Sequence, residues 1–213
     1  MRLRVSTLEA YRRLLQTEYG DEAELAERMR RGQWTDDGQQ KWQMLAGTAW
    51  HRALAGEAPD AALMEQKPAV YRYGGYWFAE DDIEAGRSHV GAGVKEVTGS
   101  IQLAGAEIEG TCDTINGLVI QDAKTKFSYP SAKDYESSLQ WRLYLLIFGA
   151  KRFQYNLFCF RDPDSSGFCA LTNVIQFCFW AYPQMQADCE RWVREFLAWN
   201  EQTLEAAVAK GAS

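Results

Sequence analysis

The sequence has few of the residues from which zinc, iron–sulfur and disulfide-stabilised proteins are built. It has only 2 histidines, and its 5 cysteines include no Cys-x-x-Cys pair. An odd number of spaced cysteines does not form a disulfide framework. We therefore expect the cysteines to be small buried side chains in a reduced compartment, rather than ligands of an iron–sulfur or zinc site. They are Cys112, Cys159, Cys169, Cys178 and Cys189.

Long apolar runs are also missing. The longest, such as residues 143–148, are far shorter than the roughly 18 residues of a membrane-spanning helix. The N-terminal residues 1–6 contain no apolar core of a signal peptide. These features predict a cytoplasmic protein that has no membrane partner.

The composition is that of an ordinary globular domain. The chain has 213 residues, of which 46% are hydrophobic and 24% charged, and this predicts one domain over residues 1–213. The net charge of −6 argues against non-specific coating of nucleic acid. It does not exclude an enzyme that acts on nucleic acid, because bound divalent cations and a local basic groove can reverse the field.

The N-terminal third, about residues 1–66, is predicted to be helical. Ser6 or Thr7 can cap a helix over about residues 8–15. A second helix is predicted over about 22–31, and Gly32 ends it. Apolar residues at helical spacing predict a third over about 39–55.

The rest of the chain alternates between strands and helices. A hairpin is predicted over residues 71–78, followed by an acidic run at 80–82 that we expect to be solvated. Asn116-Gly117 is a strong hairpin turn. Strands flanked by helices predict an α/β domain with a central mixed sheet. The predicted strands cover residues 94–103, 107–115, 118–124, 153–160 and 170–182, and the helices cover 131–149 and about 184–208.

Two aspartates lie on neighbouring predicted strands. Asp113 precedes the Asn116-Gly117 turn, and Asp122 lies near the end of the next strand. Adjacent strands are about 4.8 Å apart, so two such carboxylates can share a metal ion. Lys124 follows Asp122 by two residues and faces the same side of a strand. Hard oxygen ligands favour Mg²⁺ or Mn²⁺, and the lysine would orient a metal-bound water or neutralise charge on an attacked phosphate.

The chain also contains a second acid-x-Lys pattern. Asp60 follows Pro59, and Glu65 precedes Lys67 by two residues. We reject this set as catalytic because residues 61–65 have high helix propensity and Pro68 follows at once.

Three further features accompany the first set. Glu96 lies on the preceding predicted strand, and could add a carboxylate. Gln140 and Tyr144 are four residues apart on one face of the following helix. His51 lies on an upstream helix that otherwise packs by tryptophan and leucine.

The ordered set resembles the RecB-type branch of the PD-(D/E)XK nuclease superfamily. The matching motifs are Gly47-x-x-x-His51, Glu96, Gly110-x-x-Asp113, Asp122-x-Lys124 and Gln140-x-x-x-Tyr144, and residues 6–11 are similar to the Ser-x-Leu-x-x-Tyr opening of that branch. The resemblance covers about residues 6–160 and implies a restriction-endonuclease-like core. It implies His51, Asp113, Asp122 and the Ala123 carbonyl as ligands of Mg²⁺ or Mn²⁺, with Glu96 a looser match. It also implies that Lys124 is catalytic and that Gln140 and Tyr144 position DNA or the lysine.

The chain departs from the family in two ways. Ala123 stands where an aromatic residue is common. The cysteine upstream of the core and the three clustered after it, which hold an iron–sulfur cluster in some members, are missing, so we expect no cluster. The Gly-x-x-x-x-Gly-Lys-Ser/Thr motif is absent, so any helicase motor would be another chain.

The combined pattern predicts a metal-dependent DNA nuclease. The resemblance favours an exonuclease of recombination or repair that acts on linear DNA, encoded by a phage or mobile element, with a homo-oligomer or a recombination protein as partner. One alternative is a catalytically silent nuclease fold that binds nucleic acid or protein, and another is RNA processing. The intact Asp113, Asp122 and Lys124 set favours the enzyme. We interpret Trp192 and Trp199 of the C-terminal helix as core or oligomer contacts rather than base-stacking residues.

Overall fold

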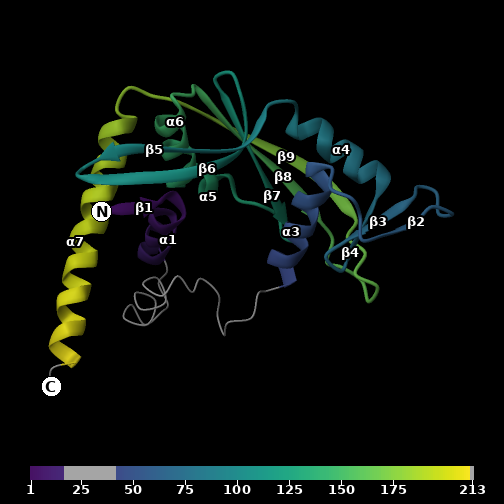
Figure 1. The fold of residues 1–213 in the computed structure, drawn as a ribbon, viewed down its shortest axis with the longest axis horizontal. Coiled ribbons are helices and arrows are strands. Elements are labelled where there is room, and N and C mark those ends of the chain that lie inside the picture. The colour runs from purple at the N-terminus through teal and green to yellow at the C-terminus, as the bar shows by residue number, and fades with distance from the viewer. Residues whose placement is uncertain (17–41, 212–213) are drawn as a thin grey trace.

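The computed structural model describes residues 1–16 and 42–211, and Figure 1 shows their arrangement. The helix predicted over residues 22–31, with Gly32 at its end, lies outside the described residues. No helix within the described part of the chain is long and apolar enough to cross a membrane.

A six-stranded mixed sheet forms the centre of the molecule (Figure 1). The strands are β1 (Arg2–Arg4), β5 (Val94–Leu103), β6 (Ala106–Asn116), β7 (Val119–Lys126), β8 (Arg152–Phe160) and β9 (Leu171–Trp180). The order is β1-β6-β7-β8-β9. β1 and β7 pair with different parts of one edge of β6, and β5 pairs along its opposite edge. The pairs β1–β6 and β7–β8 are parallel, and the remaining pairs are antiparallel. The predicted mixed sheet is confirmed.

Helices cover both faces of this sheet. The helices α1 (Val5–Gln16), α6 (Leu139–Phe148) and α7 (Met185–Gly211) pack with one face, near the short α5 (Ala132–Glu136). The helices α3 (Trp42–Ala55) and α4 (Glu80–Val90) pack on the other face. Each face of the sheet has its own hydrophobic core, because side chains along β8 point alternately to the two faces. Phe153, Tyr155 and Leu157 belong to the core beneath α1, α6 and α7, and Phe158 and Phe160 belong to the core beneath α3 and α4.

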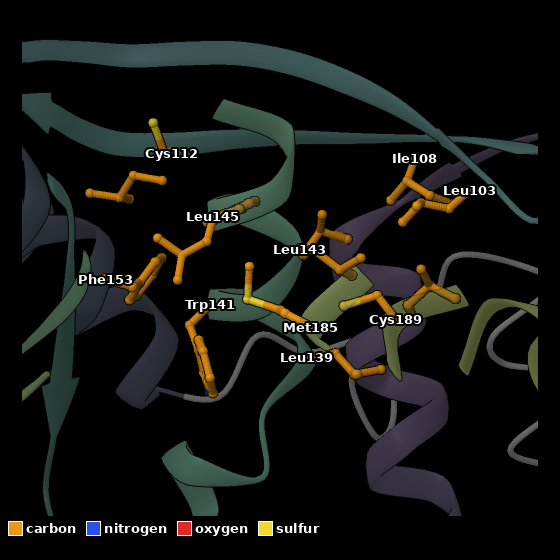
Figure 2. Close-up of a cluster of buried hydrophobic side chains, with 14 of the residues drawn as sticks. Leu103, Ile108, Cys112, Leu139, Trp141, Leu143, Leu145, Phe153, Met185 and Cys189 are labelled. Atoms are coloured by element: carbon orange, nitrogen blue, oxygen red, sulfur yellow. The ribbon is translucent and has the colours of Figure 1, made fainter. Parts of the chain in front are cut away.

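The larger core contains α6, which is apolar around most of its circumference (Figure 2). Leu139, Leu143 and Leu145 are almost fully buried there. Cys112 and Cys189 lie in the same cluster, and all five cysteines are free thiols. Burial raises the pKa of Cys169 and Cys189 to about 12, so these thiols stay neutral. The prediction that the cysteines are mainly small buried residues is confirmed, although Cys178 is only partly buried.

A second, three-stranded antiparallel sheet lies beside α3 and α4. It consists of β2 (Ala61–Leu63), β3 (Val70–Tyr73) and β4 (Tyr76–Ala79). The predicted hairpin is confirmed, with its turn at Gly74 and Gly75, whose φ angles of 55° and 92° suit glycine. The predicted helix over 61–65 is wrong. Pairing of β2 with β3 overrides the helix propensity of Ala and Leu, which is a weak preference.

Several boundaries also differ from the prediction. Residues 80–82, expected to be solvated, form the first turn of α4, where acidic residues complement the helix dipole. Asp81 is exposed, and Glu80 and Asp82 are half-buried. Residues 131–149 form two helices, because Ser138 leaves the helical conformation and caps α6. The predicted helical region over 1–66 contains β1 and β2, and α1 begins at Val5, before the expected Ser6 or Thr7 cap.

Candidate active site

The two predicted aspartates face each other where β6 and β7 separate. The antiparallel ladder ends at the pair Thr114 and Gln121. Continuing this register places Asp113 directly opposite Asp122. Here the Oδ2 atom of Asp113 accepts the backbone N–H of Ala123 at 2.9 Å, in place of a backbone acceptor. Earlier in β6, residues 107–109 pair with β1. Asp113 therefore lies between the part of β6 that pairs with β1 and the part that pairs with β7.

Asp122 is the most buried charged group of the site, with 1% of its surface exposed. Its Oδ1 atom accepts hydrogen bonds from Lys124 Nζ at 3.0 Å and from Gln140 Nε2 at 2.9 Å. Burial raises the pKa of Asp122 to about 7, against the opposing charge of Lys124. Its Oδ2 atom lies 2.9 Å from Lys124 Nζ but accepts no hydrogen bond from the described residues. The charge of Lys124 therefore balances this buried oxygen, which accepts no directed hydrogen bond from the described residues.

Lys124 forms an ion pair with the buried Asp122 and is itself partly exposed to solvent. Burial lowers the pKa of Lys124, but the charges of Asp122 and Asp113 outweigh this effect and raise it. The side chain is nevertheless 38% exposed, so a molecule approaching from solvent can reach the ammonium group. The structure thus places a permanent positive charge beside the two carboxylates.

The helix α6 fixes the opposite wall of the site. Gln140 binds Asp122, and the Tyr144 hydroxyl donates to the Thr111 carbonyl of β6 at 2.8 Å. A Cβ atom at Gly110 would collide with the Tyr144 ring and lie 2.9 Å from Val5. The glycine of the Gly-x-x-Asp motif therefore allows α6 and α1 to approach β6.

His51 approaches the site from α3. Its Nε2 atom lies 3.0 Å from the Ala123 carbonyl oxygen. A Cβ atom at Gly47, one turn earlier, would lie 2.8 Å from the Thr125 hydroxyl oxygen. The absence of a side chain at Gly47 lets α3 lie close to β7. His51 and Asp113 thus both bind the backbone of Ala123.

Glu96 is less closely integrated. In the β5–β6 register it lies opposite Asp113, between the pairs formed by Lys95 and Val97. Its side chain is exposed, and its φ of 54° lies in the left-handed region. This conformation is uncommon for a residue other than glycine.

The donor atoms suit a hard divalent cation. Carboxylate oxygens and a backbone carbonyl are typical ligands of Mn²⁺ and Mg²⁺, whereas imidazole is a typical ligand of transition-metal ions. No three of the described His, Cys, Asp and Glu side chains stand together in an arrangement that would hold a metal ion. Asp113 and His51 are bonded to the Ala123 backbone instead. Among the described residues, Asp122 Oδ2 accepts no hydrogen bond but forms an ion pair with Lys124, so a cation would bind this oxygen beside the ammonium group or in its place.

The second acid-x-Lys pattern has a structural role. Asp60 accepts hydrogen bonds from Arg52 at 3.1 Å and from the Gly74 N–H at 2.6 Å. Glu65 and Lys67 are exposed and follow β2 of the small sheet. The reason given for rejecting this set, a helix, is wrong.

We still predict that Glu65→Ala and Lys67→Ala proteins keep most of any nuclease activity, because these exposed side chains follow a strand of the small sheet, whereas Asp122 and Lys124 lie on the main sheet. The measurement is cleavage of linear DNA by each variant beside Asp122→Ala. Loss of cleavage in the first two with activity retained in Asp122→Ala would show that the wrong acid-x-Lys pair was chosen.

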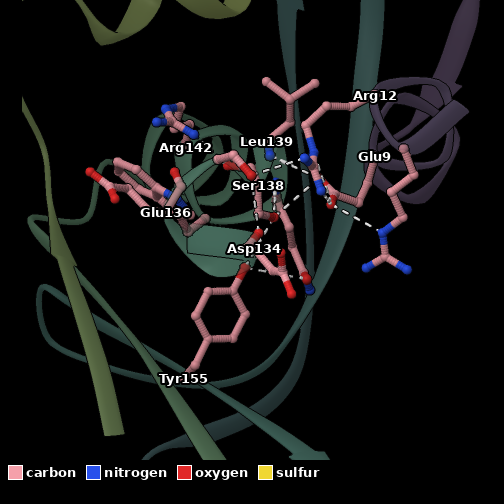
Figure 3. A network of polar contacts seen from close by, with 12 residues as sticks. Glu9, Arg12, Asp134, Glu136, Ser138, Leu139, Arg142 and Tyr155 are labelled. Atoms are coloured by element: carbon pink, nitrogen blue, oxygen red, sulfur yellow. Dashed lines mark hydrogen bonds and ion pairs between the residues drawn. The ribbon is translucent and has the colours of Figure 1, made fainter. Parts of the chain in front are cut away.

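Sequence reasoning missed a buried polar cluster next to the site (Figure 3). Glu9, Arg12, Ser138 and Tyr155 are each 8% exposed or less. They come from α1, the start of α6 and β8. The available signal was a glutamate within the Ser-x-Leu-x-x-Tyr opening, to which no role was assigned.

The fold is similar to that of solved exonucleases. No family model matches the sequence, and no curated protein matches it. A protein from Eubacterium rectale that is described as an exonuclease has a TM-score of 0.57 at 14% identity, with 96% of this chain and 82% of that chain covered. An alkaline exonuclease from Laribacter hongkongensis, LHK-Exo, has a TM-score of 0.55 at 13% identity, with 99% and 93% covered. LHK-Exo in complex with dAMP has a TM-score of 0.54 at 15% identity, with the same coverage. At these identities the likeness is one of fold.

Proposed function

We propose that this chain is a divalent-metal-dependent DNA nuclease of the RecB-type PD-(D/E)XK branch, and specifically an exonuclease that acts on linear DNA in recombination or repair. The observation that carries the proposal is the position of Asp113 opposite Asp122, with Lys124 bound to the latter. Similarity of fold to proteins described as exonucleases supports it. The dAMP complex of LHK-Exo supports DNA as the substrate class.

In this proposal the ligands of Mn²⁺ or Mg²⁺ are Asp113, Asp122, His51 and the Ala123 carbonyl. Glu96 is a looser candidate because its side chain is exposed. When bound there, such a cation would polarise the phosphate and lower the pKa of a bound water. Asp122 carries its charge at a cost in the buried site, which favours binding of a cation.

The protein groups orient and stabilise the reacting phosphate. Lys124 keeps its proton and is partly exposed, so it can stabilise negative charge that develops on the phosphate. Gln140 holds Asp122 in place from α6, and Tyr144 holds β6. The resemblance implies that these two residues position the lysine or DNA, and their hydrogen bonds support a role in positioning the strands that carry the carboxylates.

The test compares linear DNA with a covalently closed circle of the same sequence. An exonuclease degrades the end-labelled linear molecule in Mn²⁺ or Mg²⁺, leaves the circle intact, and stops when EDTA is added. Cleavage of the circle would indicate an endonuclease, and cleavage of a matched RNA alone would indicate RNA processing. Binding of DNA without cleavage in either metal would favour the alternative of a silent nuclease fold.

A further inference from the structure

We propose that Glu9 is a positioning residue of the site: with Arg12 it fixes the N-terminus of α6, the helix whose Gln140 side chain binds Asp122. The catalytic part of this inference rests on the proposed nuclease function. The hydrogen bonds that carry it are independent of that function, and several of them are drawn in Figure 3.

Glu9 lies inside the protein with its charge fully engaged. Glu9 is 7% exposed and Arg12 is 4% exposed. The Oε1 atom of Glu9 accepts hydrogen bonds from Arg12 Nη2 at 2.7 Å and Nε at 3.2 Å, and from Arg13 Nε at 3.4 Å. Arg12 Nη1 also donates to the Ser137 hydroxyl at 3.0 Å. The pair therefore joins α1 to the residues that precede α6.

The second oxygen of Glu9 binds the beginning of α6. Its Oε2 atom accepts the Leu139 N–H at 2.8 Å and the Ser138 hydroxyl at 3.1 Å. The Ser138 hydroxyl oxygen in turn accepts the Gln140 N–H at 3.1 Å. The first N–H groups of a helix have no partner within the helix, and a negative charge is favourable there. Glu9 thus supplies, from another helix, the cap and the charge at this helix end.

Tyr155 lies between this cap and the Gln140 side chain that binds Asp122. Ser138 gives its hydroxyl proton to Glu9 and Tyr155 gives its own to Gln140, so these two hydroxyl groups are in contact without a hydrogen bond between them. The hydroxyl groups of Ser138 and Tyr155 lie 3.3 Å apart, and the Tyr155 hydroxyl donates to Gln140 Oε1 at 3.5 Å. With its oxygen directed to Tyr155, the Gln140 amide directs its N–H group to Asp122 Oδ1 at 2.9 Å. Burial keeps the pKa of Tyr155 well above its ordinary value, so the hydroxyl retains the proton that it donates.

Stability alone does not account for an ion pair at this position. A buried ion pair is often replaceable by apolar residues without loss of stability. The two carboxylate oxygens of Glu9 have different partners. Arg12 binds one of them, and the other accepts a backbone N–H group from the helix that carries Gln140. The arrangement of this ion pair fits a role in orienting α6 and its Gln140 side chain.

The test uses single-turnover cleavage of bound linear DNA together with DNA affinity. We expect Glu9→Gln to cut roughly tenfold more slowly at nearly unchanged affinity. In a Gln140→Ala background the same change should alter the rate by about twofold or less, because the residue through which Glu9 acts is gone. Tyr155→Phe removes only the hydroxyl that orients the Gln140 amide. If Glu9→Gln does not fold, Ser138→Ala carries the same test, because it removes the hydroxyl that joins Glu9 to the Gln140 N–H.

A matched control separates positioning from general destabilisation. Val193→Ala, in the buried core on α7, should lower the melting temperature without changing the cutting rate below the melting range. If Glu9→Gln and Ser138→Ala behave like Val193→Ala, or if their effects add fully to that of Gln140→Ala, the inference is overturned and Glu9 only supports the fold.

A second readout does not depend on cleavage. The side-chain amide NMR signal of Gln140 should shift in Glu9→Gln and Ser138→Ala proteins, as it should in Tyr155→Phe, but not in Val193→Ala. If the wild-type protein cuts no DNA, the proposed function fails, and this signal alone decides the inference. An unchanged Gln140 signal in both Glu9→Gln and Ser138→Ala would overturn it even in an active nuclease.

Discussion

Lys124→Met protein should bind linear DNA nearly as well as wild type and cut it about 10²–10³ times more slowly. The ammonium group lies 2.9–3.0 Å from both oxygens of Asp122 and remains partly exposed. Charge on the phosphate grows toward the transition state, so loss of the lysine should affect the chemical step more than binding. The measurement is single-turnover cleavage at saturating enzyme beside a binding titration.

Lys126→Met is the matched control for this variant. Lys126 lies two residues further along β7, where burial and Arg13 lower its pKa, and it contacts the Tyr135 ring. Removing this charge should lower the affinity for DNA and make that affinity less dependent on salt concentration. The cutting rate of bound DNA should be nearly unchanged. If Lys124→Met loses only affinity, as we expect for Lys126→Met, then Lys124 is a phosphate anchor and has no catalytic role.

Asp113→Asn should reduce cleavage by roughly 10³-fold or more while leaving the fold intact. The asparagine keeps an oxygen that can accept the Ala123 N–H, so the contact between β6 and β7 can survive. Only the negative charge, which strengthens the binding of a divalent cation, is removed. Asp113→Ala should be equally inactive and also lose that contact, so a lower melting temperature should distinguish it from Asp113→Asn.

Metal binding can be followed in the same proteins without DNA. A ligand present at one hundred times its dissociation constant stabilises a protein by about 2.7 kcal/mol, or roughly 5–10 °C for a chain of this size. We expect Mn²⁺ to raise the melting temperature of wild-type protein, but to have little effect on Asp113→Asn. Cleavage at the wild-type rate by well-folded Asp113→Asn would remove Asp113 from the proposed site.

The part of the site on β6 and β7 could be predicted from local sequence. Asn116-Gly117 specifies a tight turn, and the turn fixes the register that places Asp113 opposite Asp122. The alternation of a strand then puts Lys124 on the same face. For these residues, short-range rules were sufficient.

The other elements depend on tertiary contacts that local rules do not contain. The strand β2 exists because β3 lies beside it, and α4 is a helix whose narrow apolar stripe packs against α3. Glu9 and Ser138 are 129 residues apart in sequence. Nothing near Glu9 indicates that its charge is placed at the start of α6, so the polar cluster became visible only in the folded chain.

The pairing of β1 with β6 joins two segments that are far apart in the sequence, and the chain between them must form a closed loop. Arg2–Arg4 meets partners about one hundred residues further along the chain, and such non-local contacts form slowly during folding. Val5 and Glu9 are carried into place by the same closure, beside Gly110 and α6. We therefore expect the contacts of Glu9 with the start of α6 to be among the last of the site to form during folding.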